Sequence, residues 1–224
     1  MAQSRHVTKN SAVQWLVSAA IGLAIFWFFM WYHAVRGKPC CVFTANKCIA
    51  IASTFCIGLA LALGPLARMF ARLDAWLPYR RTLGLTGAYA ILAHLALSLF
   101  VLNEKFPLKW YGDYWLCAVF GAAAFVLLAA ITIHSYPSGV KRLGRDRWVG
   151  LQKLAWIGMV LVLGHVLLLG KAPGWVKWLR TFNKPLPPGA FTTSCFCALV
   201  LALKVVDVMR GKGRDEGSEM SDQG

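Results

Sequence analysis

Two of the five histidines, His94 and His165, lie deep inside long apolar segments, where their side chains could bind a metal. A polar side chain left unpaired in hydrocarbon costs about 2–3 kcal/mol, so each imidazole needs a partner. Counting along each helix at about 1.5 Å per residue places both in the outer half of a membrane. Two neutral imidazoles at one level suit the axial positions of a haem iron. The alternative is that each histidine only hydrogen-bonds a neighbouring helix.

The other three histidines lie near the ends of apolar segments or outside them, where a polar side chain costs little. His6 belongs to the N-terminal tail and His33 to the outer end of the first segment, so we expect structural roles for both. His134 closes the fourth segment, where an imidazole can interact with the helix C-terminus. A role for His134 as an inner haem ligand is the alternative.

Glycines precede the two buried histidines at matching distances, since Gly87 comes seven residues before His94 and Gly158 seven before His165. Seven residues are two helical turns, so each glycine lies on the face that bears its histidine. A missing side chain there would make room for the face of a porphyrin. The alternative is that both glycines serve close packing between membrane helices.

Hydropathy predicts the elements that must position these residues. Of the 224 residues, 58% are apolar and 15% are charged. A membrane helix needs about 20 apolar residues, and six stretches qualify: 12–33, 47–68, 83–103, 114–134, 149–169 and 190–208. The sequence therefore predicts an all-α polytopic membrane protein, a bundle of six transmembrane helices in one domain over residues 1–210. The polar residues 211–224 are predicted to be a disordered cytoplasmic tail.

The net charge of +15 is explained by topology rather than by nucleic-acid binding. Lysine and arginine lie almost wholly between or beyond the apolar segments, and more of them fall on the side of the two termini. The positive-inside rule then places both termini in the cytoplasm. We expect a multi-pass protein of the bacterial inner membrane whose surroundings are lipid.

Short motifs flank both histidines in a fixed order: PLAR at 65–68, RRTLGL at 80–85 before His94, and LGRDRWVGLQKL at 143–154 before His165. This set resembles the ferric-reductase-like transmembrane domain superfamily. Within it, the set is most similar to the haem-binding membrane subunits of periplasmic methionine-sulfoxide reductase systems. The resemblance covers about residues 64–168.

The resemblance implies a b-type haem held by His94 and His165. It also implies electron transfer across the bilayer. Where the family usually has a further histidine after the Trp-x-x-Leu run, this chain has Gln152. Larger relatives with two haems carry an inner ligand where this chain has Arg80. Neither residue is a usual haem ligand, so one haem on the outer side is expected.

The electron donor is expected to be a separate molecule, because the chain has no flavin domain after its last apolar segment. A separate flavin reductase or a membrane quinol would serve, as would FMN or FAD bound at the inner face. Arg80 and Arg81 belong to an inner arginine cluster that could hold a flavin phosphate. That cluster could instead only fix topology against anionic lipid. The acceptor would be ferric iron or an outer reductase partner.

Two rival functions follow from other features. Cys40, Cys41 and Cys48 precede or begin the second segment on the outer side, where disulfides persist. A membrane thiol/quinone oxidoreductase is therefore one alternative, although the C-x-x-C spacing typical of redox thiols is missing. A transporter or assembly protein, with its histidines joining helices, is the other. Against a transporter, no charged residue interrupts the first five segments near the midplane of the membrane.

Overall fold

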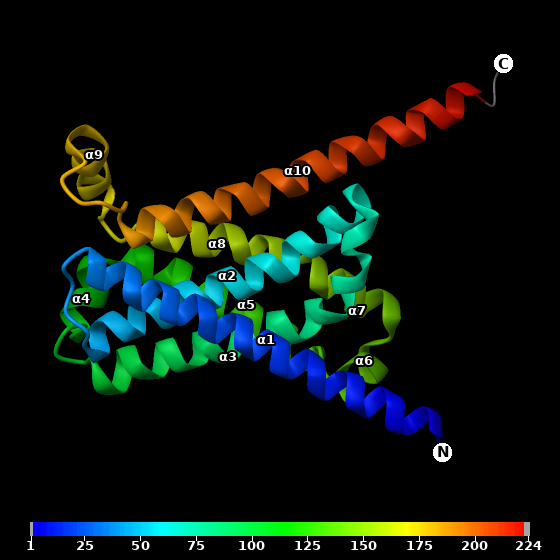
Figure 1. Ribbon diagram of the computed structural model, residues 1–224, viewed down its shortest axis with the longest axis horizontal. Helices are drawn as coiled ribbons and strands as arrows, with labels where there is room; N and C mark the ends of the chain where they lie inside the picture. The colour runs from blue at the N-terminus through cyan, green and yellow to red at the C-terminus, as the bar shows by residue number, and fades with distance from the viewer. Residues whose placement is uncertain (1, 222–224) are drawn as a thin grey trace.

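Six apolar stretches of the chain form helical segments long enough to cross a membrane. The structure is a computed structural model that describes the backbone of residues 2–221 (Figure 1). It describes the side chains of this range except those of residues 2–10, Pro137, Val140, Arg145 and residues 211–221. The spans are Ser11–Val35, Val42–Met69, Ala71–Val101, Trp115–His134, Asp146–Leu167 and Gly189–Arg210. The predicted all-α, multi-pass fold is confirmed, and the described residues include no strand.

Within the described residues 2–221, ten α-helices and two other helical segments make up these spans and their connections. They are α1 (Ala2–Val35), α2 (Val42–Met69), the 3₁₀ segment η1 (Ala71–Tyr79), α3 (Arg80–Ala96), the π-helical segment η2 (Leu97–Val101), α4 (Leu108–Asp113), α5 (Trp115–His134), α6 (Pro137–Leu143), α7 (Arg145–Lys153), α8 (Ala155–Leu167), α9 (Ala172–Thr181) and α10 (Gly189–Ser221). The third span therefore joins η1, α3 and η2, and the fifth joins most of α7 to α8.

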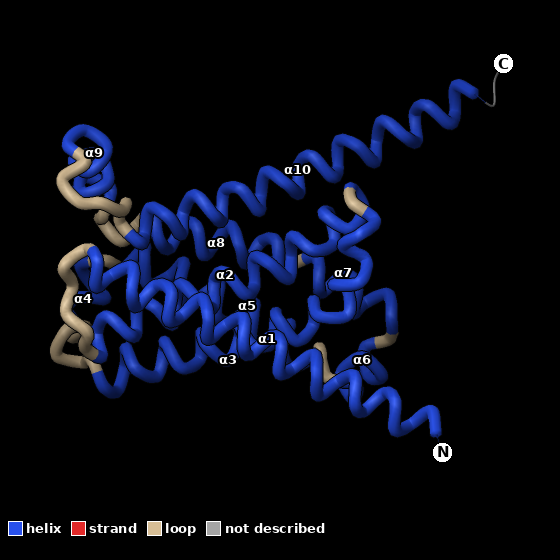
Figure 2. The backbone as a smooth tube through the Cα atoms, viewed as in Figure 1, coloured by secondary structure: helices blue, strands red, loops and turns tan. Residues whose placement is uncertain are grey.

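The connections divide between the two ends of the bundle. The short helices α4 and α9 lie at one end, while α6, α7 and both chain termini lie at the other (Figure 1). The longer loops lie at the same end of the bundle as α4 and α9 (Figure 2). We call this end the outer end, because the sequence predicts cytoplasmic termini. That both termini lie at one end follows from the structure, whereas their cytoplasmic location stays a prediction.

Four helices form the centre of the bundle. Helix α2 packs on α3, α3 on α5, α5 on α8, and α8 on α2, so the four helices close a ring. Helices α3 and α8, which carry the two intramembrane histidines, occupy opposite corners of this ring. Each of them contacts both α2 and α5.

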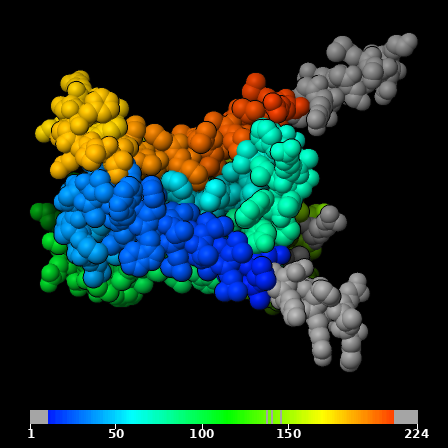
Figure 3. Space-filling model, in the orientation of Figure 1, coloured from blue at the N-terminus to red at the C-terminus, as the bar shows by residue number. Residues whose placement is uncertain are grey.

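The first and last spans flank this ring. Helix α1 packs on α2 and α3, and α10 packs on α2 and α8. Figure 3 shows α1 and α10 on one face, with part of α2 between them. Near the inner end, Arg68 of α2 donates two hydrogen bonds of 2.7 and 2.5 Å to Asp207 of α10. Because the Arg68 side chain is 59% exposed, this ion pair contributes at most about 1 kcal/mol.

The inner half of the bundle is filled by apolar side chains. Helices α2, α5, α8 and α10 all contribute to one buried cluster, which consists of Ile57, Leu61, Leu128, Ala155, Met159, Cys197 and Val200.

The predicted disordered tail, residues 211–224, lies beyond the side chains that the structure describes. Residues 222–224 lie outside the described backbone as well. The division into a membrane domain at 1–210 and a disordered tail therefore stays a prediction.

Candidate functional site

His94 lies near the outer end of α3, just before the π-helical segment, and its half-buried ring is held by α2. Its Nδ1 lies 2.9 Å from the side-chain oxygen of Asn46 and 3.2 Å from the backbone oxygen of the same residue. The Asn46 amide nitrogen in turn donates to the Ser98 hydroxyl at 2.9 Å. The Ser98 hydroxyl donates to the His94 carbonyl at 2.8 Å, which closes a loop of hydrogen bonds. Asn46 and Ser98 are buried, so this network is shielded from solvent.

His165 lies near the end of α8 and is held by α5 in a similar way. Its Nδ1 donates to the Cys117 backbone oxygen at 2.8 Å. The Cys117 sulfur lies 3.3 Å from the same nitrogen, and its thiol donates to the His165 carbonyl at 3.5 Å. Cys117 is buried, whereas the His165 ring is half-buried.

The protonated nitrogen of both rings follows from these contacts. A carbonyl oxygen can only accept a hydrogen bond, so Nδ1 of each imidazole carries the proton. The lone pair of each neutral ring is then on Nε2. Metal-binding histidines are commonly held in this state, with the second nitrogen donating to a carbonyl or carboxylate. Both rings are therefore prepared to bind a metal through Nε2.

The two histidines occupy equivalent positions in two equivalent hairpins, α2–α3 and α5–α8. Asn46 and His94 are 48 residues apart, and so are Cys117 and His165. The contacts around the ring agree, since α2·α3 corresponds to α5·α8 and α3·α5 corresponds to α8·α2. Equivalent positions place the imidazoles at one level of the bundle.

Gly121 of α5 provides the space in which the His165 ring lies. A side-chain carbon added at Gly121 would lie 2.7 Å from His165 Nδ1 and 3.0 Å from Cε1. Gly121 follows Cys117 by one helical turn, so the two residues bound the same notch of α5. Only a glycine leaves this notch open for the ring.

The predicted glycines Gly87 and Gly158 lie against helices. A side-chain carbon at Gly87 would lie 2.6 Å from a side-chain carbon of Ile57 and 2.9 Å from the Ser53 backbone oxygen, both in α2. Ser53 also donates a 2.7 Å hydrogen bond to the Gly87 carbonyl. At Gly158 the same carbon would touch Leu128 of α5 at 3.4 Å. The space at Gly87 is thus taken up by α2, as the close-packing alternative expects.

The structure separates the predicted arginines Arg80 and Arg81. The Arg80 guanidinium turns onto α2, where it donates to the Ala60 backbone oxygen at 2.9 Å and covers Gly64. Arg81 is exposed, and its guanidinium carbon lies 5.9 Å from the centre of the Tyr136 ring. Of the two, only Arg81 remains open to a ligand at the inner surface.

A comparison with curated proteins shows similarity to one relative. A segment of 125 residues is 34% identical to the protein-methionine-sulfoxide reductase heme-binding subunit MsrQ of Rhodospirillum rubrum. This chain is similar to a haem-binding subunit. The match covers 51% of this chain and 58% of the relative, so the chain spans little more than half the length of the protein it matches. A scan against protein families found no matching family. Similarity to MsrQ is therefore shown, and the wider ferric-reductase-like resemblance stays a prediction.

The remaining described histidines hydrogen-bond to their own helices, unlike the pair at the outer end of the ring. His33 Nδ1 donates to the Phe29 carbonyl at 2.8 Å, and its ring packs against Gly189. His134 Nδ1 donates to the Ala130 carbonyl at 2.8 Å. These contacts agree with the structural roles predicted for both. The side chain of His6 lies outside the described residues.

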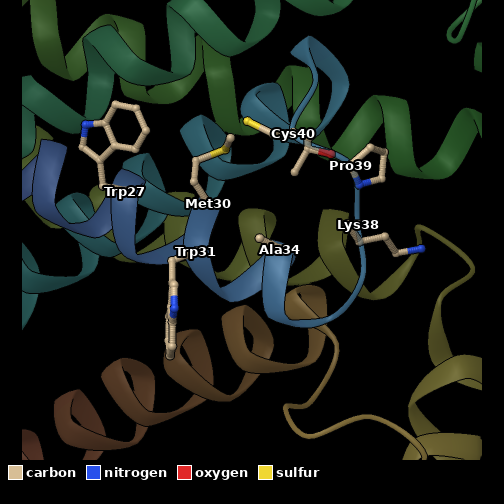
Figure 4. A pocket seen from close by; sticks show the side chains of 8 residues that line it. Trp27, Met30, Trp31, Ala34, Lys38, Pro39 and Cys40 are labelled. Carbon is tan, nitrogen blue, oxygen red and sulfur yellow. The ribbon is translucent and has the colours of Figure 1, made fainter.

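The cysteines that support the rival thiol function are all free. Cys40 and Cys41 are exposed at the outer end, while Cys48 is buried in α2 with its sulfur 3.8 Å from His33 Nδ1. Cys40 and Met30 line an apolar pocket of about 280 Å³ between the end of α1 and the start of α2 (Figure 4). The lining of this pocket includes neither His94 nor His165.

The pKa of the Cys41 thiol is lowered, chiefly by a hydrogen bond with the Thr44 side chain. A lower pKa means more thiolate at neutral pH, and the thiolate is the reactive form. In a Cys40→Ser background, we expect Thr44→Val to slow labelling of Cys41 by a membrane-impermeant maleimide at pH 7. At a pH above both pKa values the two rates should become equal. Equal rates at every pH would show that Thr44 does not activate this thiol.

Sequence reasoning missed the residues that hold the two imidazoles. Asn46 falls just outside the predicted segment 47–68, and it is buried in an apolar span because α2 begins earlier, at Val42. Cys117 acts mainly through its backbone oxygen, which any residue would supply. Gly121 is one of 20 glycines, and its role depends on which face of α5 meets α8.

Proposed function

We propose that this protein is a b-type haem membrane protein that transfers electrons across the bilayer. The observation that carries this proposal is the matched pair of imidazoles. His94 and His165 lie at equivalent positions on opposite corners of the ring, and each is protonated on Nδ1 and free to bind through Nε2. Similarity to a haem-binding subunit supports the same ligand.

The donor set suits a haem better than a bare metal ion. Structural zinc sites usually take four ligands from the protein, whereas a haem iron needs only one or two side chains because the porphyrin supplies the rest. Two imidazoles alone therefore match the requirement of haem. When bound, the haem would supply one-electron transfer. The polypeptide would supply the two ligands, hold their orientation and exclude water.

A single haem near the outer end agrees with the packing of the interior. Both histidines, and the residues that hold them, lie near the outer ends of their helices. The apolar cluster that contains Leu61 and Met159 lies farther toward the inner end of the bundle. Arg80, at the position of the inner ligand in larger relatives, is engaged with the Ala60 carbonyl.

Electrons would enter from the cytoplasmic side or from quinol and leave to an outer acceptor. A separate flavin reductase is one donor, and FMN or FAD bound at the inner face is another. Exposed arginines at the inner end, among them Arg72, Arg81 and Arg147, support binding of an anionic cofactor there. Ferric iron or an outer reductase partner would accept the electrons. We place the protein in a bacterial inner membrane, with both termini in the cytoplasm.

The test is a reduced-minus-oxidised absorption spectrum of the full chain, purified in detergent after expression with sufficient haem. We expect a sharp α band of the kind given by haem with two histidine ligands. Iron and protein assays on the same sample should give about one iron per chain. A purified, folded chain without this band would contradict haem binding, and about two irons per chain would contradict the single site.

A further inference from the structure

The two imidazoles differ in the group that accepts the hydrogen bond from their Nδ1–H. At His165 the acceptor at 2.8 Å is a backbone carbonyl, with the Cys117 sulfur beside it at 3.3 Å. At His94 the closest acceptor is the amide side chain of Asn46, at 2.9 Å, and the Asn46 backbone carbonyl is farther away at 3.2 Å. Asn46 and Cys117 are equivalent residues of the two hairpins. The side chain at this one position thus makes the sites of the two histidines unequal.

The Asn46 amide is fixed in a single orientation. Its nitrogen donates to Ser98, and Ser98 donates to the His94 backbone, so the oxygen must face the imidazole. Asn46 is 1% exposed, and water cannot replace its oxygen as an acceptor. Ser98 lies in the π-helical segment Leu97–Val101. Such a segment inside a helix is often found at functional sites.

We propose that Asn46 is a positioning residue that strengthens His94 as a metal ligand and lowers the reduction potential of the site. This inference rests on the proposed function. An acceptor at Nδ1–H raises the basicity of Nε2 and fixes the plane of the ring. A more basic ligand stabilises the more positive, oxidised state of a metal. The chain would therefore tune the potential at His94, where the closest acceptor is a side chain, whereas at His165 it is a backbone carbonyl.

The most informative variant is Asn46→Cys, which gives α2 the residue that α5 already has at the equivalent position. We expect the purified full chain to keep its haem and to show a higher reduction potential. A tenfold change in the reduction equilibrium, about 59 mV for one electron, is the expected size. Asn46→Asp should move the potential below that of Asn46→Cys, because a carboxylate accepts the Nδ1–H bond more strongly.

Thr54→Val is the matched control. Thr54 is another buried polar residue of α2, and its hydroxyl donates to the Ala50 carbonyl of its own helix at 3.0 Å. We expect this variant to keep the wild-type potential. If Asn46→Cys does not accumulate as a folded protein, Ser98→Ala tests the same network, since it frees the Asn46 amide to rotate. It should raise the potential in the same direction by a smaller amount.

Redox titration and the α-band position separate the outcomes. A wild-type chain without haem would overturn the proposed function itself. If the wild-type chain binds haem but Asn46→Cys and Ser98→Ala leave the reduction potential unchanged, only the role of Asn46 is overturned. Equal shifts in Thr54→Val and Asn46→Cys would also overturn it, because the effect would then come from any buried polar change in α2.

Discussion

Purified His94→Ala and His165→Ala proteins are each expected to lose the sharp reduced α band. Their haem content should fall by about tenfold or more relative to the wild type. In the proposed function each ring would bind the same iron through Nε2, and alanine has no group that can replace it. The backbone fold should survive, because both rings are half-buried and the inner apolar cluster does not include them. Haem content per chain and a circular dichroism spectrum measure the two quantities separately.

His33→Ala and His134→Ala are the controls for this prediction. Both rings donate to carbonyl oxygens of their own helices. We expect both variants to keep the α band. If His134→Ala removed the band while His94→Ala kept it, the ligand pair proposed here would be wrong and an inner site would take its place.

Hydropathy alone located the six spans to within a few residues over most of the chain, because membrane length and the exclusion of charge restrict where a span can begin and end. The third span departs most, since it includes the 3₁₀ segment from Ala71. The short helices α4, α6 and α9 are too short or too polar for this signal. Their positions depend on the packing of the bundle.

The site was only partly predictable, for a geometric reason. Helical periodicity shows that Gly87 shares a face with His94, but it does not show which helix that face meets. The structure places α2 there, and the close contact with Ser53 and Ile57 takes up the space. Consecutive arginines present a similar difficulty. Arg80 and Arg81 diverge by about 100° around the helix, so one enters the bundle and the other stays at its surface.

The equivalence of the hairpins explains why two distant histidines reach one level. Each hairpin runs inward on its first helix and outward on its second, and the residue that accepts the Nδ1 proton lies near the start of the first helix. Because the separation is 48 residues in both hairpins, the second helix returns each ring to the level of the residue that holds it. The repeat fixes the position of the rings, and the side chains of Asn46 and Cys117 then make the two ligands differ.

Gly121→Ala is expected to lower haem affinity by about tenfold or more, although it adds a single methyl group. That methyl carbon would lie 2.7 Å from His165 Nδ1, closer than carbon and nitrogen atoms can approach without a shift. Since the ring is held by the Cys117 carbonyl one turn away, it can move only by lengthening this hydrogen bond and turning Nε2. Alanine is a better helix former than glycine by about 1 kcal/mol, so α5 itself should not be weakened.

Gly150→Ala is the matched control, because a side-chain carbon at Gly150 of α7 meets no atom within 4 Å. Haem titration of the purified chains, followed at the Soret band, measures affinity in both variants. We expect Gly150→Ala to bind as the wild type does and Gly121→Ala to bind more weakly, with a broader α band. Unchanged affinity and band shape in Gly121→Ala would show that His165 does not bind the iron in the orientation that the Cys117 carbonyl imposes.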